Sequence, residues 1–595
     1  MIKRLPWVRR VGAGLLALLG VVALAGAWVG VRGLNARDHL RQAAVLMDQL
    51  RWEMAGGDTR AAAATLASLQ RQTARARAQS DDPGWRLGRG TPVVGDDLAA
   101  VSTVAAALDD LAREGLPPLV ETAGSVDLGA LTPRAGRVDL APLRAAAPRL
   151  AAADDAVRRA RDRVAGIDPD GLADRLRAPL RQLRDSLDRA ATQVATAART
   201  AQLLPGMLGA DGPRSYLVVF QNLAEVRATG GLPGAFVTLR ADRGAIRIVD
   251  QSTASALGRF ARPVLPLDPA RRALYTDRLG TYPADVNFAP HFPTAAQLLR
   301  EMYRRRSGRT VDGVLATDPV AMAGLLRVLG PVPVPGGPTL TADNAVRVLL
   351  SETYAHSASS TAQDRYFAAA ARAAFQALTT RRTDPVALAA ELARAAGERR
   401  LLLWSADPAQ QRLIAGTVLE GVLPTSDGRR PTVGVFLNDG SGAKLGYYLR
   451  AAAELSLGAC RPDGRRELLL RFSLGSTAPA SGLSEYVLGA GLAGDPYTVR
   501  TNVALYTSPG GAISRVLLDG ARARLGTGLE GRRAVGLVTV DLRPGQTRVL
   551  EATLLTGVPA GGWGTGPVTP RLWTTPGVTP WRLSVRSADG CDASK

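Results

Sequence analysis

The hydrophobic and polar positions of the chain form four successive patterns, and each predicts a different kind of structure. The first is an uncharged apolar run over residues 11–31, with four basic residues shortly before it and Arg32 directly after it. The run is about as long as a helix that crosses a bilayer. The heavier positive charge on its N-terminal side predicts a cytoplasmic N-terminus. We therefore expect residues 1–32 to form a cytoplasmic tail and a single-pass anchor in the cell membrane, with the bulk of the chain extracytoplasmic.

Two other interpretations of this run stay open. The small residues at 23–25 and 25–27 have the form of a cleavage site, so the run could be the core of a cleaved signal peptide. It could also be a buried core helix, although an apolar run behind basic residues has little to pack against. An uncleaved anchor fits the length of the run better than either alternative.

The second pattern covers residues 33–205, which are rich in Ala, Leu and Arg and poor in aromatic residues. Apolar residues recur at helical spacing. Breaks are expected at 56–57, 81–84 and 117–118, where Gly, Asp and Pro cluster. The segment therefore predicts an α-helical stalk or bundle. The apolar faces are formed by Leu40, Ala43, Ala44, Met47 and Leu50, and by Leu172, Leu176, Leu180, Leu183 and Leu187.

The third pattern, over residues 211–425, mixes strands and helices. Compact apolar runs predict strands, and a turn at 242–244 predicts a hairpin. Longer periodic segments predict helices at 294–304, up to residue 329, and at 362–379. Such a mixture is typical of an α/β or α+β domain. The expected strands lie at 215–220, 235–239, 245–249 and 312–318.

The fourth pattern begins near residue 430 and continues to residue 595. Short strand-like runs alternate with Gly and Pro, and no long helical pattern occurs. This texture predicts an antiparallel β-sandwich. The whole chain is therefore expected to be a multidomain α+β protein.

Composition adds a formal charge of +21, which is carried almost entirely by arginine, because lysine occurs only at Lys3, Lys444 and Lys595. A basic surface can bind nucleic acid. Aromatic residues make up only 5% of the chain, however, and they are not interleaved with basic ones. We therefore expect no nucleic-acid partner, and anionic envelope polymers or lipid phosphates suit this charge better.

The chain has two cysteines, Cys460 and Cys591. Neither has metal-ligand spacing to another Cys or His. In an oxidising compartment such a pair can form a disulfide, and two free thiols are the alternative.

Familiar catalytic motifs are missing from the sequence. It contains no Walker-type phosphate loop, no HExxH and no nucleophile elbow. A hydrolase that uses His291 is a weak alternative, since no nucleophile is recognisable. Three polar segments remain as candidates for a site, at 221–234, 285–293 and 363–367. The paired glycines within the first would allow a close approach of backbone to a ligand.

Taken together, the blocks at 216–234, 285–296, 311–330 and 363–378 resemble an actinobacterial family of single-pass membrane proteins that is catalogued as a domain of unknown function. The order of these blocks is also similar, more distantly, to the LytR-CpsA-Psr domain. That second resemblance implies an α/β/α fold for residues 211–425. It also implies transfer of glycopolymers from polyprenyl-pyrophosphate carriers to the cell wall.

The LytR-CpsA-Psr resemblance further implies roles for individual residues. Arg227, Arg365 and Asn287 would bind phosphate, and Glu225 or Asp285 would hold Mg²⁺. Arginine forks suit phosphate, and phosphoryl transfer depends on charge neutralisation. The aspartate that usually follows the first arginine in that family is absent, since 227–229 reads Arg-Ala-Thr.

Two functions follow from these expectations. The first is recognition of a polyprenyl-(pyro)phosphate-linked glycan, with transfer of the glycopolymer to the cell wall. The second is a non-catalytic envelope protein that binds or scaffolds with the same fold, and the missing aspartate favours it. The sequence identifies no catalytic residue, acceptor or oligomeric state.

Overall fold

The computed structural model of the chain describes residues 6–92, 94–125, 136–356, 360–489, 491–564 and 566–591, with the side chains of residues 6–25, 356, 360 and 361 excepted. The chain forms two compact units. One, which we call the helical unit, comprises Met1–Leu131 and Asp139–Asp211. The other, which we call the mixed unit, comprises Thr132–Val138 and Gly212–Lys595.

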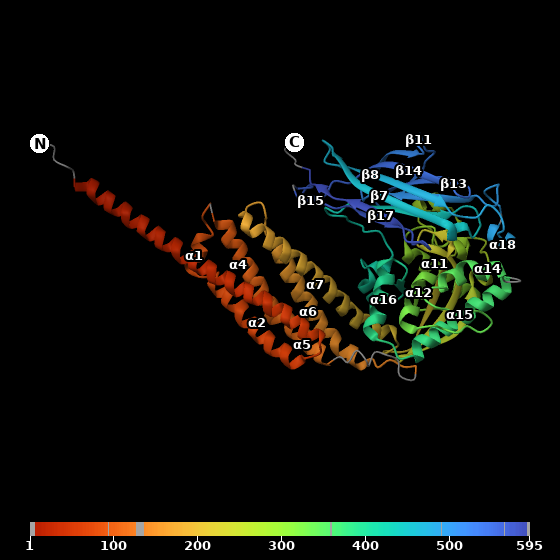
Figure 1. Cartoon of the computed structure of the whole chain (residues 1–595), viewed down its shortest axis with the longest axis horizontal. Coiled ribbons are helices and arrows are strands. Elements are labelled where there is room, and N and C mark those ends of the chain that lie inside the picture. Colours follow the sequence, from red (N-terminus) through yellow and green to blue (C-terminus); the bar gives the residue numbers. More distant parts are fainter. Residues whose placement is uncertain are drawn as a thin grey trace. The chain divides into compact units, whose positions relative to one another are not determined.

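The described residues of the helical unit are mostly helical (Figure 1). The helical faces predicted from the sequence supply its core: Leu50 of the first helix packs in one cluster with Leu69 of the second, and Leu187 packs in another cluster with Val157. The elements are α1 (Pro6–Ala55), α2 (Thr59–Gln79), α3 (Pro83–Gly88), α4 (Gly95–Asp110), the π-helical turn η1 (Leu111–Gly115), α5 (Leu116–Ser125), α6 (Ala141–Ala165) and α7 (Asp174–Met207).

Two of the three predicted helix breaks are confirmed. The glycines at 56–57 separate α1 from α2, and the segment at 81–84 separates α2 from α3. The break predicted at 117–118 is wrong. The chain stays helical there, since η1 runs directly into α5, and the π-helical turn before the two prolines is a common way for a helix to accommodate an irregularity.

The N-terminal part of the expected fold class needs correction. In the described part of the chain, no helix is both long and apolar enough to cross a membrane. Residues 11–31 lie within α1, and the side chains up to residue 25 are outside the described ones. At the described end of the run, the indole N–H of Trp28 donates to Asp82 at 2.9 Å, and Arg32 pairs with the same carboxylate at 3.2 Å. The expected transmembrane helix is therefore not supported by the residues that the structure describes.

The mixed unit begins with a five-stranded sheet of order β3-β2-β1-β4-β5, in which only β1 and β4 are parallel. All four predicted strands of this region are confirmed. The predicted hairpin at 242–244 joins β2 and β3, and Arg243 and Gly244 have positive φ angles of 48° and 80°. The strands are β1 (Arg214–Arg227), β2 (Gly230–Asp242), β3 (Ala245–Thr253), β4 (Gly313–Thr317) and β5 (Leu402–Ser405).

Helices cover both faces of this sheet. Leu217 of β1 shares a core cluster with Leu298 of α11. Since side chains alternate along a strand, Phe220 points to the opposite face, where it lies with residues of α12 and α15. The elements are α8 (Ala254–Leu257), α9 (Pro269–Tyr275), α10 (Arg278–Thr281), η3 (Pro283–Asp285), α11 (Phe292–Ser307), α12 (Pro319–Leu329), α13 (Ala345–Arg347), η4 (Val348–Glu352), α14 (Thr353–His356), α15 (Ser360–Thr380), α16 (Pro385–Gly397), α17 (Pro408–Ile414) and η5 (Val418–Glu420).

The rest of the mixed unit contains a six-stranded sheet of order β11-β10-β14-β8-β7-β17 and a five-stranded sheet of order β12-β13-β9-β6-β16, which share one apolar core. The short helices η6 (Leu445–Tyr448) and α18 (Glu485–Leu488) interrupt them. The strands are β6 (Thr432–Asp439), β7 (Leu449–Cys460), β8 (Arg466–Ser476), β9 (Val499–Tyr506), β10 (Ala512–Leu518), β11 (Ala521–Arg522), β12 (Gly526–Glu530), β13 (Arg533–Leu542), β14 (Thr547–Leu555), β15 (Pro567–Val568), β16 (Arg571–Thr574), β17 (Arg582–Arg586) and β18 (Ala588–Asp589).

The expectation of a purely antiparallel sandwich is wrong at two edges. β16 pairs with β6, and β17 pairs with β7, both in parallel. Each of these strands is joined to its neighbour by a long stretch of chain rather than by a hairpin, and such a connection permits parallel pairing.

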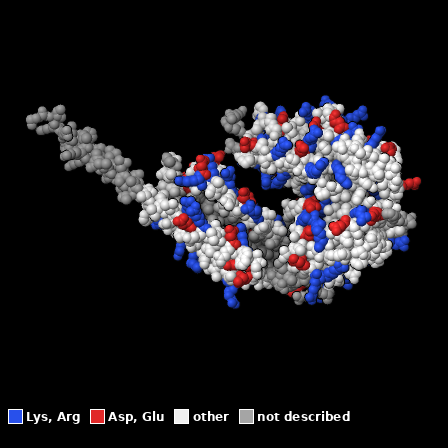
Figure 2. Space-filling view, in the orientation of Figure 1, with Lys and Arg blue, Asp and Glu red and all other residues white. Residues whose placement is uncertain are grey.

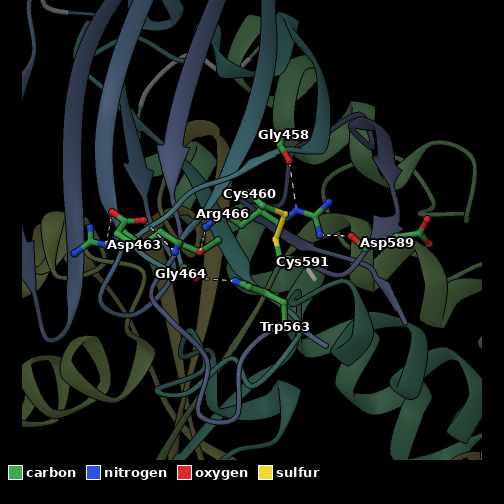
Figure 3. The surroundings of a disulfide bond; sticks show 10 residues. Gly458, Cys460, Asp463, Gly464, Arg466, Trp563, Asp589 and Cys591 are labelled. Carbon is green, nitrogen blue, oxygen red and sulfur yellow. Dashed lines mark hydrogen bonds and ion pairs between the residues drawn. A yellow bond between two sulfur atoms is a disulfide. The ribbon is translucent and has the colours of Figure 1, made fainter. Parts of the chain in front are cut away.

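Cys460, at the end of β7, and Cys591 form a disulfide with their Cα atoms 5.8 Å apart (Figure 3). Of the two alternatives that the sequence leaves open, the structure has the disulfide. Around it, the Arg466 guanidinium donates to the carbonyls of Gly458 and Asp589, and the Trp563 indole donates to the Gly464 carbonyl at 3.0 Å. These contacts fix the C-terminal segment to β7 and β8.

Basic side chains are spread over the described surface. Figure 2 shows Lys and Arg interspersed with Asp and Glu on the visible face, without a continuous basic stripe. Many arginines pair with a neighbouring carboxylate, as Arg548 does with Asp519 at 2.6 Å and Arg471 with Glu551 at 2.6 Å. Much of the formal charge on this face is therefore locally balanced.

Candidate functional site

Strand β1 is irregular where it carries the first polar segment. Its register against β2 shifts after Phe220 and again after Asn222, so residues 223–225 have no partner in β2. Such a bulge redirects side chains. It places Gln221, Asn222 and Glu225 on the wall of one cavity.

The paired glycines after β1 accommodate this bulge. This differs from the interpretation of the sequence, in which they allow a ligand to approach the backbone. A Cβ on Gly231 would lie 2.1 Å from the Asn222 carbonyl oxygen, and Gly230 has a φ of 141°. The two glycines therefore let β2 approach the bulged β1. The close approach that they permit is of backbone to backbone, and no ligand is needed to explain it.

The cavity has a volume of about 450 Å³, within the range of small-molecule sites. One part of its wall is apolar and comes from both strands and helices: Phe220, Leu232, Met322, Leu349, Leu350 and Phe367. Another part is polar and includes Gln221, Asn222, Glu225, Arg259, Gln363 and Lys444. An apolar wall with a few polar groups is the usual composition of a pocket for an amphiphilic molecule.

Lys444 lies at the centre of the polar part. Its ammonium is 2.8 Å from Glu225 Oε1, with exposed side-chain fractions of 13% and 14%. It also lies 4.3 Å from the ring centroid of Tyr486 and 5.4 Å from that of Tyr354. Burial raises the pKa of Tyr354, so its hydroxyl remains protonated at neutral pH.

Close packing of η6 against the bulge brings Lys444 to Glu225. A Cβ on Gly446 would lie 2.7 Å from the Ala224 carbonyl oxygen, so glycine is required for this approach. The bulge in β1 and a turn more than two hundred residues later therefore build the charged part of the cavity together.

Asn287, predicted to bind phosphate, instead orients a neighbour. It is 2% exposed, and its amide nitrogen donates to Gln221 Oε1 at 3.1 Å, to Thr229 Oγ1 at 2.9 Å and to the Gly231 carbonyl at 2.9 Å. Thr229 also donates to Gln221 Oε1, at 2.7 Å. The Gln221 amide oxygen is thus held by two donors, and among the described residues its buried Nε2 has no partner. Asn287 and Thr229 therefore fix the orientation of the Gln221 side chain beside the cavity.

Arg227 and Asp285 are brought together, but as a buried ion pair. Arg227 Nη2 lies 3.1 Å from Asp285 Oδ1, and the two side chains are 8% and 2% exposed. The other guanidinium donors go to the carbonyls of Ala284 and Val226, and the ring of Phe288 packs against the group at 4.9 Å. Asp285 also binds Arg278 at 2.7 Å. Neither member of the pair is on the cavity wall, so this geometry gives Arg227 a structural role.

Arg365 lies on α15 and is exposed. Its neighbours Gln363 and Asp364 line the cavity, whereas Arg365 itself does not. The structure therefore brings Glu225 to the cavity and leaves Arg227, Arg365, Asn287 and Asp285 outside its wall.

The two carboxylates predicted to hold Mg²⁺ do not fit that role. Glu225 is paired with Lys444, and Asp285 is paired with two arginines. Over the described ranges, no group of three or more His, Cys, Asp or Glu residues could hold a metal ion. A magnesium site built from these residues would first have to displace the cations that they already bind.

Lys444 is the residue that sequence reasoning missed. The available signal was compositional, because it is the only lysine between the two ends of an arginine-rich chain. Its partner could not be found in this way, since Glu225 lies far away in the sequence.

Residues 211–354 match the family described as Protein of unknown function (DUF4012). The resemblance to a family of unknown function is therefore confirmed over the first part of the mixed unit, whereas the comparisons do not show the resemblance to the LytR-CpsA-Psr domain. A comparison with curated proteins finds no match.

Among solved structures, this chain is similar over short stretches to M1 zinc metallopeptidase from Deinococcus radiodurans. One such structure is 18% identical, covers 19% of this chain and 21% of that chain, and has a TM-score of 0.12. A mutant bound to a Tyr-Ser-Ala substrate is 15% identical and covers 21% and 32%, with the same TM-score of 0.12. Similarity at this level supports no conclusion about fold or activity.

Proposed function

We propose that this chain, which carries a DUF4012 domain, binds a polyprenyl-(pyro)phosphate-linked glycan of the cell envelope in the cavity of its mixed unit. One observation carries the proposal: the cavity joins an apolar wall to the only internal lysine of the chain. The isoprenoid part of the ligand would lie against Phe220, Met322 and Phe367, and its phosphate would lie at Lys444.

The chemistry of both parts suits such a ligand. Isoprenoid chains are hydrocarbon, and burial of their surface is favourable at about 25 cal/mol per Å². A lysine ammonium binds phosphate as a point charge. Asn222, Arg259 and Gln363 add further polar groups to the same cavity wall, and these suit a phosphate or sugar oxygen.

Binding without transfer is the form of this proposal that the site favours. Transfer of the LytR-CpsA-Psr type would require Mg²⁺, and the candidate carboxylates are already neutralised by cations. We therefore derive no step through a metal. A binding or scaffolding protein of the envelope needs only the cavity.

The disulfide supports a location outside the cytoplasm. Disulfides persist in oxidising compartments and are rare in the cytosol. Cys460 and Cys591 join segments that are separated by 131 residues, so the bond constrains the sandwich as a whole. Carrier-linked glycans of the envelope are used in that same compartment.

The test is calorimetric binding of a short-chain prenyl pyrophosphate to the full chain, with magnesium and with a chelator. We expect Lys444→Met to weaken binding by about tenfold or more, because it removes a charged donor. Ala371→Phe should also weaken it, since this residue lines the cavity and a larger side chain would fill the space. Arg548→Met is the matched control, because it removes one cation from an ion pair outside the cavity wall.

If the wild type binds the ligand and both cavity variants bind it equally well, the ligand lies elsewhere and the proposal is wrong. Loss of binding in the chelator would show that a metal bridges the phosphate. Transfer would then have to be reconsidered.

A further inference from the structure

The pairing of Lys444 with Glu225 has a consequence for ligand binding, and it rests on the function proposed above. We infer that Glu225 is an internal competitor for Lys444: it occupies the ammonium until the anionic group of the ligand displaces it. Glu225 would then set the affinity of the site, although it gains no contact with the ligand.

The geometry of the pair permits such an exchange. Among the described residues, Glu225 is the only polar partner of the Lys444 ammonium, which has three N–H donors. The rings of Tyr486 and Tyr354 lie within cation–π range, so the ammonium keeps favourable contacts if it moves away from the carboxylate. Lysine also has a flexible stem that allows a short displacement.

Glu225 also keeps a hydrogen-bond partner after the exchange. The side-chain amide of Asn222 donates to Glu225 Oε1 at 3.2 Å. The carboxylate would therefore retain a hydrogen bond when Lys444 turns to the ligand. An unpaired buried carboxylate would be far more costly, and this second donor lowers that cost.

The charges of Glu225 and Lys444 determine which ligands the competition affects. Glu225 and Lys444 both lie on the cavity wall and are mostly buried, so they interact with a bound anion at reduced dielectric. An anion that binds at Lys444 has to draw the ammonium away from Glu225, so part of its attraction to the ammonium is offset by the loss of that pair. The carboxylate therefore weakens binding of every anionic ligand and leaves a neutral one unaffected, which favours reversible uptake and release.

The test is Glu225→Gln, which keeps the shape of the side chain and an oxygen for Asn222. We expect prenyl pyrophosphate to bind about tenfold tighter or more, mainly through slower dissociation, because the Lys444 ammonium no longer has to leave a carboxylate. The affinity for the corresponding neutral prenol should stay the same. Glu551→Gln is the matched control, since it removes a carboxylate that pairs with Arg471 away from the cavity.

A double variant separates competition from a general change in charge. In Glu225→Gln with Lys444→Met, the gain should vanish, because Glu225 acts only through Lys444. If the gain persists in the double variant, the inference is wrong, since the carboxylate would then act on the ligand directly. Where Glu225→Gln fails to fold, Glu225→Asp draws the carboxylate back from Lys444 and should give a smaller gain of the same sign.

The outcomes also distinguish this inference from the proposed function. If Lys444→Met weakens binding but Glu225→Gln leaves it unchanged or weaker, Glu225 merely positions the lysine, and only the inference is overturned. If Lys444→Met has no effect on binding of the pyrophosphate, the proposed function itself fails.

Discussion

Two ion pairs in the mixed unit are made from similar residues and differ in what surrounds them. Arg227–Asp285 is 8% and 2% exposed, and every donor group of the guanidinium is directed at a protein acceptor. Lys444–Glu225 is 13% and 14% exposed and lies on a cavity wall, and among the described residues part of the ammonium has no protein acceptor. Both cations lie near aromatic rings, so the rings do not distinguish them.

The difference lies in hydrogen-bond capacity. A guanidinium whose three nitrogens all donate to protein acceptors stabilises the fold, because removing it would leave the buried Asp285 with only the exposed Arg278 as a cation. An ammonium with donors to spare beside a cavity can bind a ligand. Charge alone, which is all that the sequence gives for Arg227 and Lys444, is insufficient to separate these two roles.

The largest expected effect on stability comes from removing the cation of the buried pair. Arg227→Met should lower the free energy of unfolding by about 3–5 kcal/mol, because Asp285 would lose its buried partner. Lys444→Met should cost only about 1–2 kcal/mol, since Glu225 keeps its hydrogen bond from Asn222. Denaturant unfolding of the two variants beside the wild type measures both values.

The reverse order of these two losses would contradict the comparison. Arg548→Met serves as the control for loss of an exposed cation and should change stability least. Among the variants that fold, Lys444→Met should bind prenyl pyrophosphate most weakly, although its loss of stability is smaller than that of Arg227→Met.

The sequence predicted local structure well where the pattern was local. The hairpin at 242–244 was predictable because turn residues and alternating strands lie side by side in the chain. The bulge at 223–225 was not, since its cause is the packing of Gly231 and Gly446 against the β1 backbone. The site therefore depends on contacts between distant segments, and only Glu225 among the predicted residues reached the cavity wall.

A second buried polar group of the mixed unit, His291, can be probed by pH. This residue caps α11, with Nδ1 accepting from the Thr294 amide at 3.3 Å, and burial together with the charge of Arg271 lowers its pKa from 6.5 to about 4. As the pH falls, the unfolded chain therefore takes up a proton first. The contribution of His291 to the free energy of unfolding is complete above about pH 6.5 and declines toward pH 4, by up to about 3 kcal/mol.

His291→Asn removes this titration and keeps a good N-cap residue. We expect the difference in unfolding free energy between the variant and the wild type to shift in favour of the variant between pH 6.5 and 4. Denaturant unfolding at several pH values measures it, and a difference that stays constant over this range would show that His291 does not titrate as the structure implies.

The smallest expected effect on stability comes from removing the second cation at Asp285. Asp285 has a second cation, Arg278, whose side chain is 57% exposed although its carboxylate partner is buried. Because solvent screens an exposed partner, Arg278→Ala should cost less than about 1 kcal/mol, far below the loss for Arg227→Met. Thermal or denaturant unfolding of Arg278→Ala measures this value. A loss as large as that for Arg227→Met would mean that Asp285 needs both cations. The structural role of the pair would then come from burial of the carboxylate, and not from the hydrogen bonds of the Arg227 guanidinium.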